Sequence, residues 1–252
     1  MNLKGLLILT GTTLCGLAVL IGLGTWQLQR KAWKDALIGQ LREQTGRVPA
    51  AYSSWLTRKK PATRQSGENP IAADLFAPVV IRGAFRHADE IYVFTTRRGR
   101  PGYLVLTPFK WRNAKAVWIN RGFVPEALRE PDTRRSSLLQ GDVEVQGIIR
   151  GPESVGWFSP APDRAKRIWY TIDLAAITKS VKIDVETTHF IEADRTPNPG
   201  GWPRGQDAKE FIRAIPNKHF GYALTWFGLA AGLCIVYGFF VRSQLRESVA
   251  DR

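Results

Sequence analysis

Two uncharged stretches decide the fold: GLLILTGTTLCGLAVLIGLGTWQLQ at residues 5–29 and HFGYALTWFGLAAGLCIVYGFFV at residues 219–241. They contain 25 and 23 consecutive residues without Asp, Glu, Lys or Arg. A helix needs about 20 apolar residues to cross the roughly 30 Å of hydrocarbon in a bilayer. Within lipid, a helix also bonds its own backbone groups. Each stretch is therefore predicted to be a transmembrane helix.

The first stretch resembles two kinds of targeting segment only in part. A signal peptide has an apolar region of about 7–15 residues and a small-residue cleavage site, whereas residues 5–29 are longer and no A-x-A sequence follows them. A mitochondrial presequence is an Arg- and Ser-rich amphipathic extension, and only Lys4 precedes the stretch with a charge. We therefore expect an uncleaved signal anchor at residues 1–29, in a bacterial cell inner membrane.

Nearly all the excess charge lies between the two stretches. Residues 30–218 hold 32 basic and 20 acidic residues, which is +12 of the chain's net +14. Such an excess indicates an anionic partner, either nucleic acid, acidic lipid or an anionic ligand. Basic residues at both ends of this segment favour a cytoplasmic location by the positive-inside rule, but that rule applies poorly to long translocated loops. Charge alone leaves the orientation open.

The segment between the stretches is predicted to be rich in strands. Short β-branched and aromatic runs, separated by Gly, Pro, Arg or Asn, occur seven times: residues 78–85, 90–97, 102–111, 115–124, 142–151, 167–174 and 185–193. Residues 173–181 have the composition of a short helix, in which Asp173 can be the N-cap or pair with an arginine. Residues 52–70 lack periodicity and are expected to be an exposed loop or insertion.

These elements define the expected fold class, an α+β membrane protein. Two transmembrane helices flank a β-rich extracytoplasmic domain at residues 30–218, built from an antiparallel sheet, sandwich or partial barrel. The first helix is expected to continue out of the membrane to about Leu41. The second helix occupies residues 219–241, and residues 242–252 form a short tail.

The absence of several motifs narrows the chemistry. Cys15 and Cys234 both fall inside the membrane stretches. A thiol–disulfide enzyme, a CxxxC copper carrier and a CxxCH haem attachment are therefore excluded from the middle segment. The sequence has no GxSxG elbow, no Walker loop and no HExxH motif.

The remaining titratable residues form no legible catalytic pair. His87 and His189 are expected to be ordinary surface or strand histidines. Asp89–Glu90 and Asp132 lie in turn-like sequences and are expected to need no partner. The chain is accordingly predicted not to be an enzyme.

The outer end of the first stretch carries the sequence GTWQLQRKAWK. The ring and the N–H of Trp26 suit the interface between lipid and water. Gln27 and Arg30 lie three positions apart and share a helix face, which Lys31 and Lys34 continue. An aromatic belt followed by cations that reach toward the head groups also explains this pattern.

The outer end of the second stretch places a histidine at the head of a stripe. At about 100° per residue, one helix face carries His219, Ala223, Trp226 and Ala230, with Tyr222 beside them. An imidazole can ligate haem iron, a small residue allows close approach, and Trp226 can stack on a macrocycle. Arg30 or the nearby lysines can pair with propionates. The alternative is an interfacial aromatic belt with a histidine near the head groups.

Small residues four apart allow two helices to approach closely. They occur at Gly228 and Gly232 in the second stretch, and at Thr12 and Gly16 and at Ala18 and Gly22 in the first. Such spacings support a helix hairpin or docking on a partner.

A series of short motifs resembles one known family. In order they are LGTWQLQRKAWK (23–34), TPF (107–109), INRGFVP (119–125), GIIRGPE (147–153), WFSP (157–160), IWYTIDL (168–174), PGGWP (199–203) and IPNKHFGYALTWFGLA (215–230). Over nearly its whole length the chain resembles the Surfeit locus protein one family (SURF-one, or Shy-one in yeast) of cytochrome c oxidase assembly factors. Residues 52–70 depart from the family pattern, because they are longer and more polar.

The resemblance implies the orientation, the role and the partners. It implies a middle domain in the periplasm or intermembrane space, with both termini cytoplasmic. It also implies a role in maturing the oxidase subunit that carries haem a. The expected partners are that catalytic subunit, the haem a synthesis machinery and the lipid bilayer.

The resemblance also implies which residues bind haem a. The histidine of the second helix, here His219, is the family's favoured iron ligand. The expected haem site comprises His219, Tyr222, Trp226, Trp26, Gln27 and Arg30. Gly200 and Gly201 match the closing signature, and the turn residues Asn120, Arg121 and Gly122 match the central one. For the turn we expect a structural role, in which side-chain-to-backbone bonds and a glycine-only backbone angle hold a strand end.

The sequence is compatible with three functions to different degrees. The leading hypothesis is a non-enzymatic assembly factor that binds haem a and assists its insertion. The alternative is a structural scaffold that stabilises an oxidase intermediate without haem. A membrane-anchored hydrolase is weakly supported, because no nucleophile–base pair is legible. Nucleic-acid binding needs a cytoplasmic middle domain and is not expected.

Overall fold

The computed structural model describes residues 3–58, 75–181, 183–213 and 215–250. They form two compact units, Met1–Gln40 with Ile215–Arg252, and Leu41–Ala214. We call the first the helix pair and the second the β domain. The helices are α1 (Leu3–Thr45), α2 (Tyr52–Arg58), α3 (Leu174–Thr178), α4 (Ala208–Arg213) and α5 (His219–Ala250). The strands are β1 (Ala50–Ala51), β2 (Pro78–Phe85), β3 (Ile91–Arg97), β4 (Arg100–Lys110), β5 (Ala116–Pro125), β6 (Val143–Arg150), β7 (Ile168–Trp169) and β8 (Val185–Ala193).

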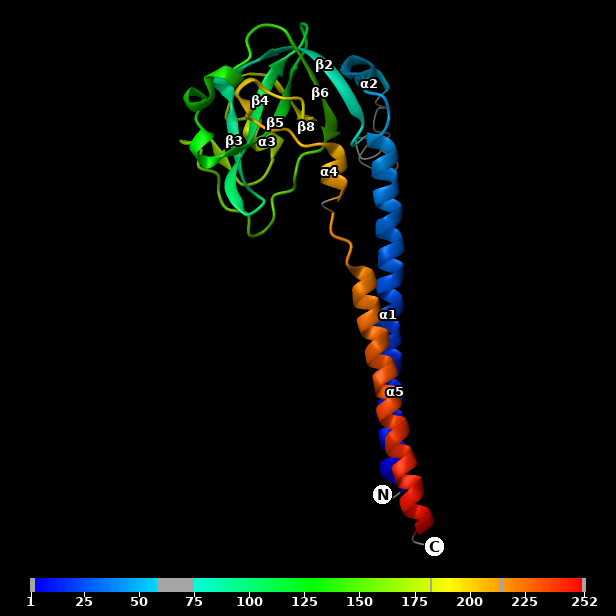
Figure 1. The fold of residues 1–252 in the computed structure, drawn as a ribbon. Coiled ribbons are helices and arrows are strands. Elements are labelled where there is room, and N and C mark those ends of the chain that lie inside the picture. Colours follow the sequence, from blue (N-terminus) through cyan, green and yellow to red (C-terminus); the bar gives the residue numbers. More distant parts are fainter. Residues whose placement is uncertain (1–2, 59–74, 182, 214, 251–252) are drawn as a thin grey trace. The chain divides into compact units, whose positions relative to one another are not determined.

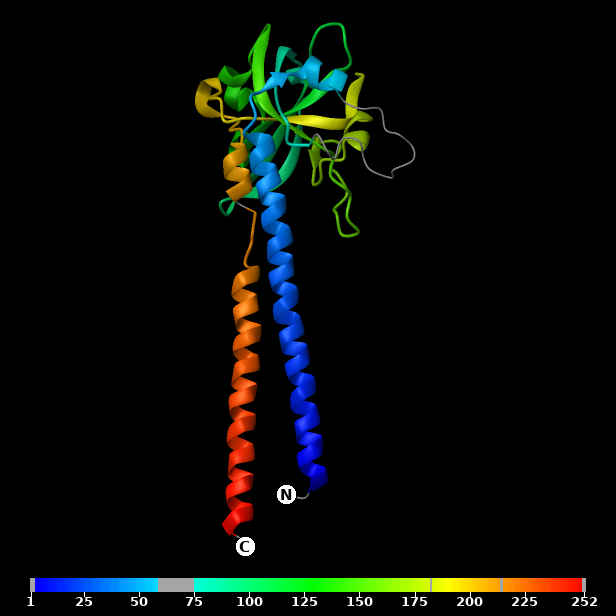
Figure 2. The ribbon, with the colours of Figure 1, turned by 90° about the vertical axis from the view of Figure 1, so that its right-hand side faces the viewer.

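In the helix pair, α1 and α5 run side by side in opposite directions, and both chain ends lie at the same end of the pair (Figure 2). Both helices are long and apolar enough to cross a membrane. At about 1.5 Å per residue, α1 has a length of about 65 Å, which exceeds the hydrocarbon thickness. The first helix therefore continues past its uncharged stretch, as predicted, although it ends at Thr45 and not near Leu41.

The two helices meet along a regular seam. On α5, one stripe of buried and half-buried positions is spaced in steps of four and three: His219, Ala223, Trp226, Ala230, Leu233 and Tyr237, with Phe227 and Gly232 half-buried beside it. This heptad spacing is typical of helices packed in the manner of a coiled coil. Across the seam, the Tyr237 hydroxyl lies 2.7 Å from the Thr10 hydroxyl. A Cβ on Gly24 would lie 2.6 Å from the Phe227 ring, so only glycine leaves that ring enough room.

Most of the small-residue spacings seen in the sequence do not form this seam. A Cβ added to Gly228, Gly232 or Gly22 would meet nothing within 4 Å. Gly16 does lie in the seam, where a Cβ would approach Leu233 to 3.3 Å. Gly228 and Gly232 were expected to help α5 pair with α1, but they do not contact it, because the heptad stripe lies on a different face of α5.

The β domain is built around a five-stranded barrel (Figure 1). Neighbouring strands pair in the order β2, β6, β8, β5, β4, and β2 then pairs with β4 at Ala84–Lys110 and Phe85–Phe109 to close the ring. All these pairs are antiparallel except β5 with β8. β3 extends from β4 and carries β7, while β1 lies parallel to β2. The predicted partial barrel is confirmed, and closure leaves most strands no free edge.

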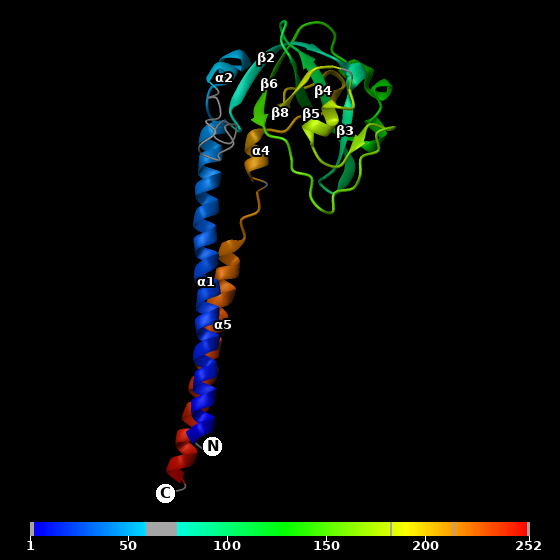
Figure 3. The ribbon, with the colours of Figure 1, turned by 180° about the vertical axis from the view of Figure 1, so that it is seen from behind.

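Strand β5 shows why the barrel has a core on both sides of its wall. Its residues Ala116 to Val124 are all buried. Val117 and Ile119 join a cluster with α2, whereas Trp118 joins a cluster with α3. Because successive strand residues face opposite sides, α2 and α3 must cover different faces of the wall. α3 is labelled in Figure 1, and Figure 3 shows the same strands from behind.

Two local predictions are wrong. Residues 52–58 were expected to be part of an exposed loop, but they form α2, whose Tyr52 and Trp55 are each 3% exposed and pack on the barrel. Long-range burial of these aromatic rings overrides a polar local sequence. The rest of the expected loop lies outside the described residues. The run at 167–174 forms only the two-residue β7, because Asp173 caps α3 by accepting from the Ala176 N–H at 3.0 Å. That cap is one of the two roles predicted for Asp173.

Candidate functional site

A hydrogen bond joins the first residue of α5 to α1. The Nδ1 of His219 lies 2.8 Å from the Oε1 of Gln27, and both side chains are half-buried. A carbonyl oxygen only accepts, so Nδ1 carries the proton in this bond. In the neutral ring the lone pair then resides on Nε2. Histidines that ligate metals are commonly oriented by such a bond from their other nitrogen.

Helix geometry places three other predicted residues on one flank of this bond. At about 100° per residue, Trp26 and Arg30 lie about 100° and 60° to the same side of Gln27. Because α5 is antiparallel to α1, Tyr222 lies about 60° from His219 toward that same flank. Trp26 and Tyr222 are 54% and 56% exposed, and Arg30 is exposed. The Gln27–His219 bond thus has aromatic rings and a cation along one side.

Two of the basic residues of α1, Arg30 and Lys31, have partners of their own. The Arg30 guanidinium stacks on Trp33, 4.1 Å from the ring centroid. Lys31 pairs with Asp35. Asp35 in turn accepts a hydrogen bond from the side-chain amide of Asn217 at 2.7 Å. This second link joins α1 to the segment just before α5, about two turns beyond Gln27 on α1, so this end of the helix pair is held at two places.

The predicted stripe on α5 is used for helix packing. Ala223 is 1% exposed and Ala230 7%. Their neighbours Phe227 and Leu233 face Gly24 and Gly16 of α1. The expectation that Ala223 gives a macrocycle close access is therefore wrong, because the same small side chain admits α1 instead. Trp226 is half-buried in this seam.

A buried ion cluster in the β domain escaped the sequence analysis. Glu90, which was expected to need no partner, is 1% exposed and accepts from Arg121 at 3.1 Å and from Arg134. His87 lies 3.2 Å from the same carboxylate. Burial raises the pKa of Glu90, but the hydrogen bonds from His87 and Arg134 and the two guanidinium charges outweigh it and hold the pKa at about 2. The cluster ties β3 to β5 and to the segment around Arg134.

His189 is likewise a buried strand residue. It lies in β8, where its Nε2 is 2.7 Å from the Tyr52 hydroxyl. Burial, aided by the charge of Glu186, raises the pKa of Tyr52, so the phenol stays neutral. The histidine was expected on a strand or at the surface, and the structure places it in a strand and fully buried. Its role is to link β8 to α2.

The Asn120–Gly122 motif has a structural role, as predicted, but it lies inside β5 (Ala116–Pro125) and not at a strand end. The Gly122 N–H donates to the Asn120 side chain at 3.0 Å, and Gly122 has φ = +107°. A Cβ at Gly122 would overlap the Arg204 carbonyl. The next residue, Phe123, exchanges two backbone hydrogen bonds of 2.9 Å with Arg204. The turn therefore fastens β5 to the segment that precedes α4.

Comparison with known proteins agrees with this architecture. The model of the SURF1 family matches residues 14–231. The chain belongs to the SURF1 family. It is 31% identical over 230 residues to Surfeit locus protein 1 of Rattus norvegicus, covering 85% of this chain and 69% of the relative. It is 30% identical over 227 residues to the Homo sapiens protein of the same name, covering 83% and 70%.

A further SURF1-like protein, from Monosiga brevicollis, is 32% identical over 232 residues, which is 84% of this chain and 80% of that protein. The range matched to the SURF1 family includes both Gln27 and His219, together with the whole barrel. The structure brings Gln27 and His219 into contact and places Trp26, Arg30 and Tyr222 beside them. Their assignment to haem, and that of Trp226, stays a prediction.

Proposed function

We propose that this member of the SURF1 family assists the assembly of haem–copper cytochrome c oxidase, and that it does so by holding haem a at His219. One observation carries the proposal: the Gln27–His219 hydrogen bond commits Nδ1 and directs the lone pair of the neutral ring to Nε2. Among the residues that the structure describes, Nε2 of His219 has no hydrogen-bond partner. An imidazole that is oriented through Nδ1 and has a lone pair on Nε2 is suited to axial ligation of iron.

The surrounding side chains fit the shape and charge of such a cargo. Haem a brings a flat macrocycle and two propionates. Trp26 and Tyr222 offer exposed ring faces on the flank of the histidine, and Arg30 offers a guanidinium for a propionate. Trp226, half-buried on the same helix, is the third aromatic residue of the proposed site. One axial histidine with stacking gives a modest affinity, which a carrier needs in order to release its cargo.

The proposal includes partners and a location. A haem a carrier of this kind receives its cargo from the haem a synthesis machinery and delivers it to the oxidase catalytic subunit, without catalysing a reaction itself. The relatives named above are eukaryotic, so the bacterial inner membrane rests on the sequence expectation. With both termini cytoplasmic, a reporter that fluoresces only in the cytoplasm is expected to fluoresce when fused to either terminus. A reporter enzyme that is active only outside the cytoplasm is expected to be active when inserted within the β domain.

A scaffold without haem is the second candidate. It is favoured by the burial of Ala223 and Ala230 in the helix seam, since that stripe then serves packing alone. In this view the Gln27–His219 bond is a staple between two helices. The two candidates differ in whether a pigment accompanies the protein.

The deciding experiment is to purify the full chain from cells that make haem a and to record its visible spectrum. Wild-type protein is expected to carry haem, His219→Ala to lose it, and the neighbouring Lys218→Ala variant to keep it. Oxidase activity in a strain lacking the native gene should follow the same order. A colourless wild-type protein, or His219→Ala with undiminished haem, would overturn the haem proposal and leave the scaffold.

A further inference from the structure

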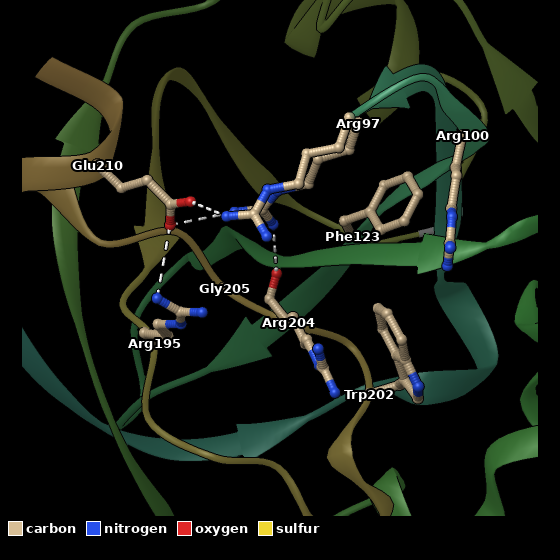
Figure 4. Close-up of a pocket in the computed structure, with 9 residues that line it drawn as sticks. Arg97, Arg100, Phe123, Arg195, Trp202, Arg204, Gly205 and Glu210 are labelled. Carbon is tan, nitrogen blue, oxygen red and sulfur yellow. Dashed lines mark hydrogen bonds and ion pairs between the residues drawn. The ribbon is translucent and has the colours of Figure 1, made fainter. Parts of the chain in front are cut away.

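The β domain contains an open cavity of about 350 Å³ lined mainly by arginines. Figure 4 shows their side chains gathered around it. The lining consists of five arginines, two aromatic residues, a glycine and one acid: Arg97, Arg98, Arg100, Arg195, Arg204, Phe123, Trp202, Gly205 and Glu210. A cavity of this size suits a small molecule or the head of a larger one.

Two of the sequence motifs build the wall of this cavity. Phe123 follows the Asn-Arg-Gly turn, and Trp202 belongs to the Pro-Gly-Gly-Trp-Pro segment. Their rings lie 6.2 Å apart, edge to face. The Arg204 guanidinium stacks over Trp202 at 4.3 Å, while its backbone pairs with Phe123. Backbone bonds and ring packing thus fix the position of at least one cation before any ligand arrives.

Charge in the cavity is unbalanced. Glu210 is the one carboxylate in the lining, against five guanidinium groups. It accepts a hydrogen bond from Arg98 at 2.9 Å and lies 3.7 Å from Arg97 and 3.6 Å from Arg195. Arg100 and Arg204 have no carboxylate partner among the described residues. Like charges held this close repel one another unless an anion joins them.

Glu210 pairs only incompletely with the guanidinium groups around it. Its Oε2 is buried and, within the described part of the chain, makes no hydrogen bond, although Arg97 and Arg195 lie at ion-pair distance from it. One carboxylate reaches toward three guanidinium groups but cannot satisfy them. A group with more acceptor oxygens and two negative charges can accept from several of these forked donors at once.

We propose that this cavity binds a phosphate monoester group, borne by an acidic lipid or present as free phosphate, and that Glu210 competes with it for the arginines. The proposal concerns a second site, made of β-domain residues alone, and is independent of haem binding at His219. The aromatic wall of Phe123 and Trp202 gives the bound group an apolar side.

The test uses the full chain in a neutral detergent and isothermal titration at pH 7.5. The two probes are inorganic phosphate and dihexanoyl phosphatidic acid, with dihexanoyl phosphatidylcholine as the lipid control. Arg97→Gln is expected to weaken binding of the preferred probe by roughly tenfold, since one charge-assisted hydrogen bond is lost. Glu210→Gln is expected to tighten binding by a similar factor. The matched control is Arg135→Gln, an exposed arginine outside the cavity that pairs with Asp132, and it should leave affinity unchanged.

The two probes distinguish a lipid from free phosphate, and the variants distinguish a loss of binding from misfolding. Tighter binding of phosphatidic acid than of phosphate identifies a lipid, and equal affinities identify free phosphate. The gain expected from Glu210→Gln is not mimicked by misfolding. The proposal is overturned if neither probe binds, if Arg135→Gln weakens binding as much as Arg97→Gln does, or if Glu210→Gln fails to tighten it.

Discussion

Gln27 of α1 holds the imidazole of His219, at the first residue of α5, through a bond of 2.8 Å between Oε1 and Nδ1. The two residues are 192 positions apart in the chain, so the orientation of this histidine depends on the pairing of the two helices. Any function of His219 Nε2 therefore depends on Gln27 as well.

Replacing Gln27 by leucine tests this dependence. The leucine keeps a similar volume but cannot accept from Nδ1, so the ring loses its fixed orientation. We expect haem affinity to fall by roughly 10- to 100-fold, as when the orienting partner of a metal ligand is removed, while Gln27→Glu, which keeps an acceptor, stays close to wild type. The measurement is haem titration by absorbance. Gln29→Leu, an exposed position on the same helix, is the control, and an equal loss there would show that leucine acts through the membrane segment in general.

The sequence foretold the features that depend on local patterns. Uncharged runs marked both long helices, since hydrophobic length is a property of consecutive residues. Alternating β-branched residues marked β2 and β8 to the residue. The bond between the Asn120 side chain and the Gly122 N–H was also predicted, because the two groups are only two residues apart. That this motif lies inside β5 and not at its end was not predicted.

Features that depend on distant partners were missed. The sequence around Glu90 does not indicate that Arg121 and Arg134 are its partners, because they lie 31 and 44 positions away. The helical state of Tyr52 and Trp55 depends on the barrel wall against which they pack. The same holds for the arginine cavity, whose cations come from β3, β4 and the segment before α4. Helix periodicity placed His219, Ala223 and Trp226 on one face of α5 but did not show that Ala223 is buried there; the assignment of these residues to haem stays a prediction.

Removing the charge of Glu90 is expected to destabilise the β domain. Arg121 and Arg134 are 2% and 5% exposed, so Glu90→Gln leaves two buried cations without their counter-charge. Breaking a buried pair in this way costs about 3–5 kcal/mol. The measurement is urea unfolding followed by circular dichroism. Asp89→Asn is the matched neighbour, since its partly exposed pair with Arg86 is expected to contribute less than about 1 kcal/mol. Equal effects of the two substitutions would contradict a special role for the buried cluster.

The same carboxylate predicts how stability depends on pH. The pKa of Glu90 is lowered from its ordinary 4.5 to about 2 in the folded chain, so between these values the unfolded state binds a proton that the folded state does not. The stabilisation is fully present above about pH 4.5 and is lost as the pH falls through about 2. Across that window the unfolding equilibrium constant should rise by up to roughly tenfold for each unit by which the pH is lowered. Unfolding curves at pH 2.5, 3.5 and 4.5 measure this slope, and Glu90→Gln should show a shallower one; identical slopes would assign the acid sensitivity to other carboxylates.

Gly24 is expected to control how closely the two helices approach. A Cβ at this position would lie 2.6 Å from the Phe227 ring, so Gly24→Ala forces the ring or the helices to move. Overpacking of this kind costs about 1–3 kcal/mol, and thermal unfolding of the purified chain in detergent measures it. Gly22→Ala, two residues earlier and with nothing within 4 Å of the added methyl group, should be neutral or slightly stabilising because alanine favours the helix.

The partner substitution makes this prediction specific to the seam. If the loss comes from the clash with Phe227, then Gly24→Ala should cost little stability in a chain that already carries Phe227→Ala, since the added methyl group then has room. A double-mutant cycle gives this coupling directly. Because Gln27 lies one turn beyond Gly24 on α1, the clash should also loosen the Gln27–His219 bond. Gly24→Ala is therefore expected to lower haem retention, and Phe227→Ala in the same chain to recover part of it. If Gly24→Ala lowers stability but leaves haem retention unchanged, then the packing of the seam does not control the orientation of His219.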